Sequence, residues 1–170
     1  MSECYLSEYT FRPLNPQDLP IIAAWLQMPH VAQWWGDDLQ QELDDIKSHI
    51  HSISVRPYII EYNNIPSGYM QSYDPHLEIN HPYQDQPPGT IGIDVSIGDP
   101  GFIGKGHGPR LIDAFVGKLF AQGVTRVIID PDPANLVAIC AYEKAGFKAF
   151  DSRTSEYGPA LMMCRDAPKE

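Results

Sequence analysis

The most regular pattern in the chain is the alternation of apolar and polar residues over positions 90–97. A period of two is that of a β-strand, so this run predicts a strand with two different faces. One face carries Ile91, Ile93, Val95 and Ile97. The other carries Asp94, and an acid in such a strand needs water, a hydrogen-bond partner or a functional site to face. We favour a functional site, because a glycine-rich segment follows almost directly.

The same periodicities predict elements over the rest of the chain. The expected strands are residues 9–12, 56–62, 65–73, 90–97, 124–130, 147–150 and 160–164. The expected helices begin at Asn15-Pro16, at Asp37-Asp38, at Pro109 and, with Asp132 as cap and Pro133 as opening residue, near Ala134. The residues expected to end these helices include Pro29, Gly123 and Gly146.

This order of elements predicts an α/β fold in which helices flank one mixed, mostly antiparallel sheet. The chain has 170 residues, which suits a single domain over 1–170 with its own core. Residues 74–89 contain four prolines and show no periodicity. A loop of this length in a compact domain is usually functional or mobile.

Charge and cysteine content narrow the class of protein. The formal net charge of −10 disfavours a nucleic-acid partner and suits a cationic substrate, although it equally suits an ordinary acidic soluble protein. The three cysteines, Cys4, Cys140 and Cys164, have no CxxC spacing and fit a reducing compartment. There is no apolar run of membrane-spanning length and no signal-peptide pattern. We expect a cytoplasmic protein without a membrane partner, as a monomer or weak homodimer.

Three glycines alternate in the segment Ile103-Gly104-Lys105-Gly106-His107-Gly108, between a predicted strand and a predicted helix. Glycine allows the chain to turn with positive φ and lets a ligand approach the main chain closely. The free N–H groups and the dipole at the start of the following helix favour an anion. The segment therefore predicts a binding site for the pyrophosphate of a nucleotide-containing cofactor.

Several other residues suggest chemistry less directly. Trp34 and Trp35 are adjacent, so either one lies in the core while the other lines a pocket, or both pack in a hydrophobic cluster. His76 and His81 lie in the long loop without a clear third ligand, so we predict no metal site. We expect no catalytic role for His49, near the end of its helix.

The C-terminal half resembles the GCN5-related N-acetyltransferase superfamily. The residues that carry the resemblance are the strand 90–97, the loop Gly104-Lys105-Gly106-His107-Gly108, the strand ending at Asp130, and Asn135 followed by Tyr142-Glu143-Lys144-Ala145-Gly146-Phe147. More narrowly, nearly the whole chain resembles the aminoglycoside 6'-N-acetyltransferases, through Trp34-Trp35-Gly36, Gly92-Ile93-Asp94 and Asp130-Pro131-Asp132-Pro133-Ala134-Asn135 among other segments. The resemblance implies a bacterial cytosolic enzyme that transfers an acetyl group from acetyl-CoA directly to an amine.

The resemblance also implies roles for particular positions. The loop from Ile103 to Gly108 would hold the acetyl-CoA pyrophosphate, with Asn135 beside the pantetheine and Ile93 and Val95 on the strand that offers a main-chain N–H to the thioester. Tyr142 would protonate the leaving thiolate; otherwise it is a core tyrosine. Asp94 would bind the substrate ammonium and accept a proton, and Asp130 would share that role or cap a turn. The proposed substrate contacts are Trp34, Trp35 and Tyr73 as an aromatic wall and Glu78 and Asp85 as additional negative charge.

Two alternatives to an aminoglycoside acetyltransferase stay open at this point. One is an acetyltransferase for another amine, such as a siderophore precursor, a polyamine or a protein N-terminus. The other is a non-catalytic module that binds acyl-CoA, because a fold alone does not confer activity.

Overall fold

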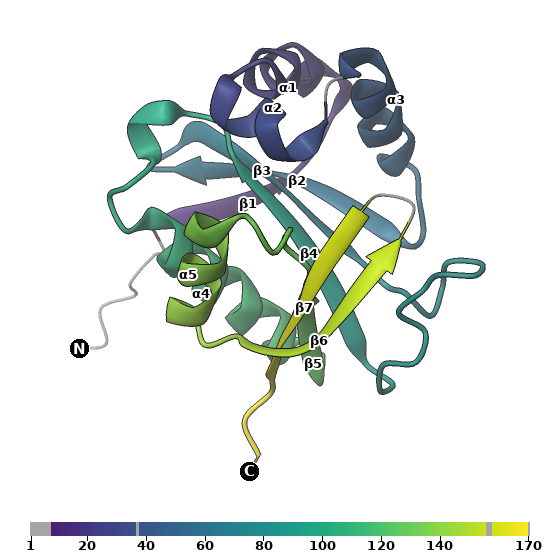
Figure 1. Cartoon of the computed structure of the whole chain (residues 1–170). Coiled ribbons are helices and arrows are strands. Elements are labelled where there is room, and N and C mark those ends of the chain that lie inside the picture. The colour runs from purple at the N-terminus through teal and green to yellow at the C-terminus, as the bar shows by residue number, and fades with distance from the viewer. Residues whose placement is uncertain (1–7, 37, 156–157, 170) are drawn as a thin grey trace.

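The structure is a computed structural model that describes residues 8–36, 38–155 and 158–169. Its centre is a seven-stranded sheet in the order β1-β2-β3-β4-β5-β7-β6 (Figure 1). The strands are β1 (Tyr9–Pro13), β2 (Val55–Tyr62), β3 (Ile65–Tyr73), β4 (Thr90–Ile97), β5 (Arg126–Ile129), β6 (Lys148–Ser155) and β7 (Gly158–Asp166). In this sheet β4 and β5 pair in parallel, and the other neighbours pair antiparallel. The predicted mixed, mostly antiparallel sheet is confirmed.

Five α-helices cover the two faces of this sheet in the described residues. They are α1 (Leu19–Leu26), α2 (Pro29–Trp35), α3 (Leu39–His49), α4 (His107–Ala121) and α5 (Leu136–Lys144). The side chains of β2 and β3 alternate between the two layers. Ile59 and Tyr69 pack with α1, α2 and α3, whereas Ile60 and Met70 pack with α4 and α5. In Figure 1 the three N-terminal helices accordingly lie apart from the α4–α5 pair.

The faces of β4 follow the predicted alternation. Ile91, Ile93, Val95 and Ile97 all belong to the core on the α4 side. Asp94 lies opposite Gln71 of β3 in the register, on the face that α1–α3 cover. The strand therefore turns its aliphatic side chains to the core and its carboxylate to the other layer.

The structure differs from the prediction most clearly at four elements, α2, α5, β6 and β7. Residues 29–35 form the separate helix α2, for which no helix was expected. The helix α5 begins at Leu136, with Asn135 and not Asp132 as its cap: the Asn135 side chain accepts from the Ala138 N–H. The last two strands are eight and nine residues long, well beyond the predicted segments 147–150 and 160–164. The cap role given to Asp38 is confirmed, since it accepts from the Gln41 N–H, whereas Asp37 lies outside the described residues.

The parallel ladder between β4 and β5 is short, and this creates the main opening in the sheet. It pairs Thr90, Ile91 and Gly92 with Arg126, Val127 and Ile128, and β5 ends one residue later. Beyond Gly92, therefore, β4 continues without a partner on its β5 side. The two strands separate, and a cleft opens between them.

Candidate active site

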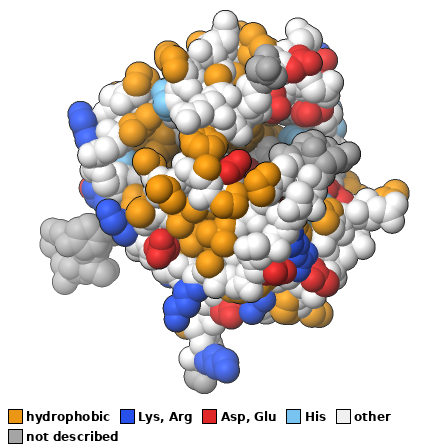
Figure 2. Space-filling view, in the orientation of Figure 1, with side chains coloured by type: hydrophobic (Ala, Val, Ile, Leu, Met, Phe, Trp, Pro, Cys, Tyr) orange, Lys and Arg blue, Asp and Glu red, His pale blue; other side chains and the backbone are white. Residues whose placement is uncertain are grey.

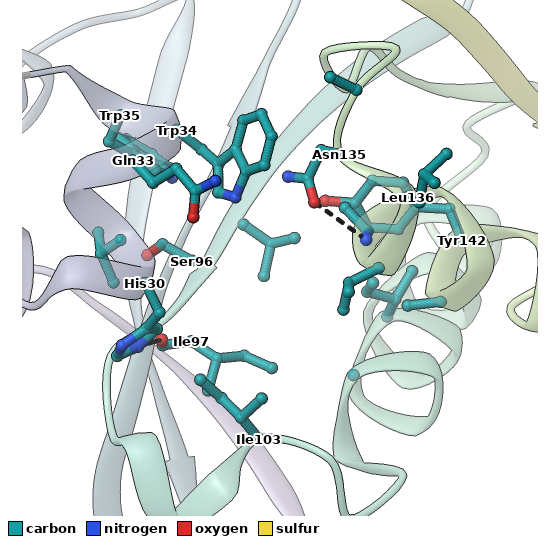
Figure 3. Close-up of a pocket in the computed structure, with 18 residues that line it drawn as sticks. His30, Gln33, Trp34, Trp35, Ser96, Ile97, Ile103, Asn135, Leu136 and Tyr142 are labelled. Carbon is teal, nitrogen blue, oxygen red and sulfur yellow. Dashed lines mark hydrogen bonds between the residues drawn. The ribbon is translucent and has the colours of Figure 1, made fainter.

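An apolar cavity of about 480 Å³ lies between α2, the end of β4 and the start of α5 (Figure 3). Its walls come from four parts of the chain: His30 to Trp35, Val95 to Ile97, the Ile103–Ile112 segment and Ala134 to Tyr142. Leu136 and Val137 are 68% and 78% exposed at its wall. Large apolar side chains left this open suggest a surface that a ligand covers.

A second cavity of about 450 Å³ adjoins the first and is strongly acidic. Its carboxylates come from three elements: Glu42 and Asp45 from α3, Asp94 from β4, and Asp130 and Asp132 from the end of β5. The two cavities share Trp34, Trp35, Val95, Asn135 and Tyr142. They are thus two halves of one cleft, which we call the apolar half and the acidic half. Figure 2 shows the hollow between α1–α3 and the α4–α5 pair, with hydrophobic side chains inside it and acidic ones near α3.

The glycine-rich loop has the backbone shape that the sequence predicts. Gly104 and Gly106 have φ of 75° and 81°, in the left-handed region where side chains are rare. A Cβ at either position would meet no protein atom within 4 Å, so space beside the main chain is open. No side chain caps the N-terminus of α4, whose N-cap is Gly106. An anion can therefore approach these amides directly.

The structure places the side chains of Ile103 and His107 differently within this loop. Ile103 lines the apolar half of the cleft. His107 instead turns into an aromatic cluster, where its ring stacks on Phe102 at 3.8 Å and its Nδ1 lies 2.8 Å from the Tyr9 hydroxyl. Any contribution of His107 to an anion is consequently a main-chain one.

The unpaired edge of β4 directs main-chain groups into the cleft. Gly98 donates its N–H to Ser67 of β3, whereas the Ile97 carbonyl accepts from His30 Nε2 at 3.0 Å on the α2 side. Backbone groups of successive strand residues point to alternate edges. The N–H and C=O of Val95 therefore point to the same edge as those of Ile97, toward the gap beside β5. The predicted free N–H at Val95 has the room it needs. The Ile93 side chain, by contrast, is fully buried in the core.

Asp94 is held at the inner end of the acidic half by a chain of hydrogen bonds. Gln71 Nε2 donates to Asp94 Oδ2 at 2.9 Å, and the Tyr69 hydroxyl donates to Gln71 Oε1 at 2.6 Å. Burial, reinforced by the nearby Asp130 carboxylate, raises the pKa of Asp94 to about 7, while the bond from Gln71 opposes this shift. A carboxylate with such a pKa accepts a proton far better than an ordinary aspartate at neutral pH.

Asp130 also lines the acidic half, and it does not cap the turn that follows it. The turn is capped by Asp132, whose side chain accepts from the Ala134 N–H. Asp130 Oδ2 instead accepts from the Tyr83 hydroxyl at 2.6 Å. Burial raises the pKa of Asp130, although the Tyr83 hydrogen bond works in the opposite direction.

Asn135 and Tyr142 lie where the two halves of the cleft meet. The Asn135 oxygen is occupied by the Ala138 N–H, so its amide nitrogen is directed across the cavity toward Trp34 (Figure 3). Tyr142 is only 8% exposed and lines both halves. Burial, with Asp94 and Asp130 nearby, raises the pKa of its hydroxyl, which therefore stays protonated at neutral pH.

The three aromatic residues expected in the substrate wall do not lie together. Trp34 and Trp35, at the end of α2, line both halves of the cleft, and Trp35 also packs edge-on against Tyr69. Tyr73 lies in the core, 7% exposed, with its ring directly over Gly92. It is absent from the wall of either half, because the Gly92 position leaves space for the ring within the sheet layer.

The two acids expected from the long loop are engaged elsewhere. Asp85 forms an ion pair with Arg153 of β6 at 2.6 Å, which offsets its negative charge. Glu78 accepts from the Ser54 hydroxyl and lies 3.6 Å from His81 Nε2. Neither residue lines the acidic half. The additional acids that line this half, Glu42 and Asp45, come instead from α3.

The sequence interpretation missed four side chains that line the acidic half. Glu42, Asp45 and His49 face it from α3, and Gln71 supports Asp94. Burial, together with the carboxylates of Asp45 and Asp38, raises the pKa of Glu42, and burial lowers the pKa of His49. An acid at every third or fourth position of an amphipathic helix ordinarily indicates a solvated face, so the pattern carried no sign of a cavity. Within the described residues, no group of three or more His, Cys, Asp or Glu side chains is placed to hold a metal ion.

Comparison with known proteins identifies the family. The acetyltransferase (GNAT) domain family matches residues 15–154. Aminoglycoside N(6')-acetyltransferase type 1 from Klebsiella pneumoniae is 36% identical over 162 residues, 91% of this chain and 81% of that protein. Lysine N-acyltransferase MbtK from Mycobacterium tuberculosis is 26% identical over 164 residues, 94% of this chain and 78% of its own length.

Solved structures of AAC(6')-Ib, one in complex with coenzyme A and kanamycin and another containing acetyl-CoA, match with a TM-score of 0.84 and 35% identity. The matches cover 93% of this chain and 93% or 94% of those chains. The family match spans most of the sequence, and the solved structures share the fold over 93% of the chain. The chain therefore belongs to the GNAT family of acetyltransferases.

Proposed function

We propose that this enzyme transfers the acetyl group of acetyl-CoA to the 6'-amine of an aminoglycoside. The observation that carries the proposal is the two-part cleft, in which an apolar half and an acidic half meet at Val95, Asn135 and Tyr142. A pantetheine arm suits the apolar half, with its diphosphate at the glycine-rich loop. A polycationic sugar suits a cavity lined by five carboxylates.

The reaction is a direct transfer within a ternary complex. The substrate ammonium gives a proton to Asp94, directly or through a water molecule, and becomes a nucleophilic amine. Its nitrogen forms a bond to the thioester carbon, and the Val95 N–H stabilises the oxygen on which negative charge develops. The C–S bond then breaks, the nitrogen gives its second proton to solvent, and the thiolate takes the proton of the Tyr142 hydroxyl. Solvent restores the proton of Tyr142 and takes the one held by Asp94. The products are an N-acetylated amine and coenzyme A.

A panel of amines in a thiol-release assay tests the acceptor. We expect turnover with 2-deoxystreptamine aminoglycosides that carry a 6'-amine, and at least tenfold lower kcat/KM for matched drugs with a 6'-hydroxyl. Asp94→Asn serves as the control for thioester hydrolysis that does not depend on the site. No turnover of any aminoglycoside by folded, coenzyme A-binding enzyme contradicts the proposal.

A lysine side chain is the second candidate acceptor, on the basis of the relationship to lysine N-acyltransferase MbtK. The five carboxylates favour an acceptor with several ammonium groups, because a free lysine also brings a carboxylate into an acidic cavity. Lysine and a linear polyamine therefore belong in the same panel. A kcat/KM for either that exceeds the values for every aminoglycoside would favour that acceptor.

A further inference from the structure

The long loop between β3 and β4, residues 74–89, reaches the acidic half of the cleft through a tyrosine hydroxyl. Tyr83 is 7% exposed, and its hydroxyl donates to Asp130 Oδ2 at 2.6 Å. The loop acids Glu78 and Asp85 do not line the cavity. The loop thus contacts the site through the carboxylate of Asp130, the residue directly after β5.

Tyr83 is fixed on several sides. Its ring packs in a core cluster with Val55, Tyr73, Ile128 and Met162. Arg153 lies over the ring with its guanidinium carbon 5.5 Å from the centroid, and it also donates to the Pro82 carbonyl at 3.1 Å. Arg153 further pairs with Asp85, two residues after Tyr83. A side chain held in this way presents its hydroxyl in one place without further loss of entropy.

The hydrogen bond from the Tyr83 hydroxyl opposes the effect of burial on the pKa of Asp130. Burial of Tyr83 raises the pKa of its hydroxyl, which stays a donor throughout the neutral range. The titratable groups that face Asp130 are Asp94 of β4, Tyr73 of β3, His81 and Tyr83 of the loop, and Tyr142 of α5. Asp132, Glu42, Asp45 and His49 line the same cavity. Among so many carboxylates, a short hydrogen bond to the ionised form favours the negative charge on Asp130.

We propose that Tyr83 is a positioning residue that orients the Asp130 carboxylate for a substrate ammonium group. This inference rests on the proposed acetylation of a polycationic amine and names how the long loop contributes to it. The loop sets the affinity for the amine through Tyr83 and Asp130, and its own acids hold the loop in place.

Kinetics of Tyr83→Phe test this role, because the variant keeps the ring and its packing and removes only the hydroxyl. The KM for the aminoglycoside should rise on the order of tenfold, as expected for loss of a hydrogen bond to a charged group, with the KM for acetyl-CoA unchanged. Tyr58→Phe is the matched control, since Tyr58 packs on Phe115 away from the cleft. In an Asp130→Asn background the second substitution should have almost no further effect. An unchanged amine KM, or fully additive effects, overturns the proposal.

A carboxyl titration tests the Tyr83–Asp130 interaction independently of activity. Carbon-13 NMR would follow Asp130 in Asp94→Asn, where the neighbouring acid no longer titrates with it. Adding Tyr83→Phe should raise the pKa of Asp130, because the hydrogen bond stabilises the ionised form. An unchanged pKa overturns the inference even if the enzyme is active. If the wild type acetylates no amine but the pKa rises, the proposed function fails while the interaction stands.

Discussion

Asp94 is a buried carboxylate whose environment suits proton transfer. In its ionised form it lowers the stability of the folded protein. Burial and Asp130 raise its pKa to about 7, whereas Gln71 holds its orientation. Because the native pKa lies above that of the unfolded chain, the native state binds more protons between the two values. Stability therefore falls as the pH rises from about 4 toward about 7, and the full cost is present above pH 7.

Asp94→Asn should consequently separate function from stability. We expect kcat to fall at least about a hundredfold, from loss of general-base catalysis, with acetyl-CoA affinity retained. At pH 8 the melting temperature should equal or exceed that of the wild type, since a charged buried group has been replaced. In the wild type, kcat/KM should rise with pH through about 7. A variant that unfolds at pH 8 would make Asp94 a structural residue.

Tyr142→Phe tests the proposed proton transfer from the Tyr142 hydroxyl to the leaving thiolate. The hydroxyl stays protonated at neutral pH because burial raises its pKa, so it is available to the leaving thiolate. We expect a fall in kcat of about tenfold to a hundredfold with little change in coenzyme A affinity measured by calorimetry. Turnover equal to that of the wild type would remove Tyr142 from the mechanism and leave it as a packing residue.

At the residue scale, the sequence showed which residues were unusual for their element, but it did not show which residues surround them in space. Asp94 could be identified because an acid in an apolar strand is unusual. Glu42 and Asp45 could not, because acids on an amphipathic helix look solvated whether or not another element covers them. Tyr73 was expected in the cleft, but the missing side chain of Gly92 gives its ring a place in the core. The register of β3 and β4 places the Tyr73 ring over Gly92. Periodicity alone does not show how two strands are aligned.

The glycine-rich loop and α4 form the element to which we assign the cofactor's diphosphate. Gly106 has φ of 81° and open space beside its Cα, whereas Gly117 lies within α4 with similar open space. The two glycines therefore offer a matched pair of substitutions. They differ in backbone conformation and in distance from the loop.

Gly106→Ala should lower stability by roughly 1 kcal/mol, the cost of a left-handed conformation for alanine. It should also raise the Kd for coenzyme A about tenfold, because the methyl group stands beside the amides that hold the diphosphate. Gly117→Ala should raise stability by roughly 0.5–1 kcal/mol and leave the Kd unchanged. Calorimetry and thermal melting measure both quantities. Equal coenzyme A affinity in the two variants would place the diphosphate elsewhere.

Elements with strong periodicity were predicted well, and short or exposed ones were not. The strand 90–97 and the hairpin of β2 and β3 alternate clearly and appear as expected. The helix α2 has seven residues between two other helices, too few for a visible helical repeat. The strand β6 is an edge strand with seven exposed residues out of eight, so it has no apolar alternation to detect.

At the scale of the whole molecule, charge is distributed unevenly over one cleft. The chain carries a net charge of −10, and five carboxylates line the acidic half. The apolar half has almost no charge of its own. In the mechanism that we propose, different forces attract a polycation and an acyl thioester to neighbouring regions that meet at Val95 and Tyr142.

This distribution predicts a salt dependence that varies with the charge of the acceptor. Raising the ionic strength from 0.01 to 0.15 M shortens the Debye length from about 30 to about 8 Å and weakens long-range attraction. The kcat/KM for a multiply charged aminoglycoside should fall several-fold, and that for a singly charged amine much less. Initial-rate assays at constant pH measure kcat/KM for both acceptors. Equal slopes for the two acceptors would show that the acidic half does not steer the substrate.

The central claim is that acceptor and donor occupy two adjoining halves of one cleft at the same time. Calorimetric titration of a 6'-amino aminoglycoside into enzyme saturated with coenzyme A tests it most directly. We predict one-to-one binding in the presence of coenzyme A, with an affinity equal to or greater than that for free enzyme. Loss of aminoglycoside binding when coenzyme A is bound would contradict the account, because the two ligands would then compete for one site.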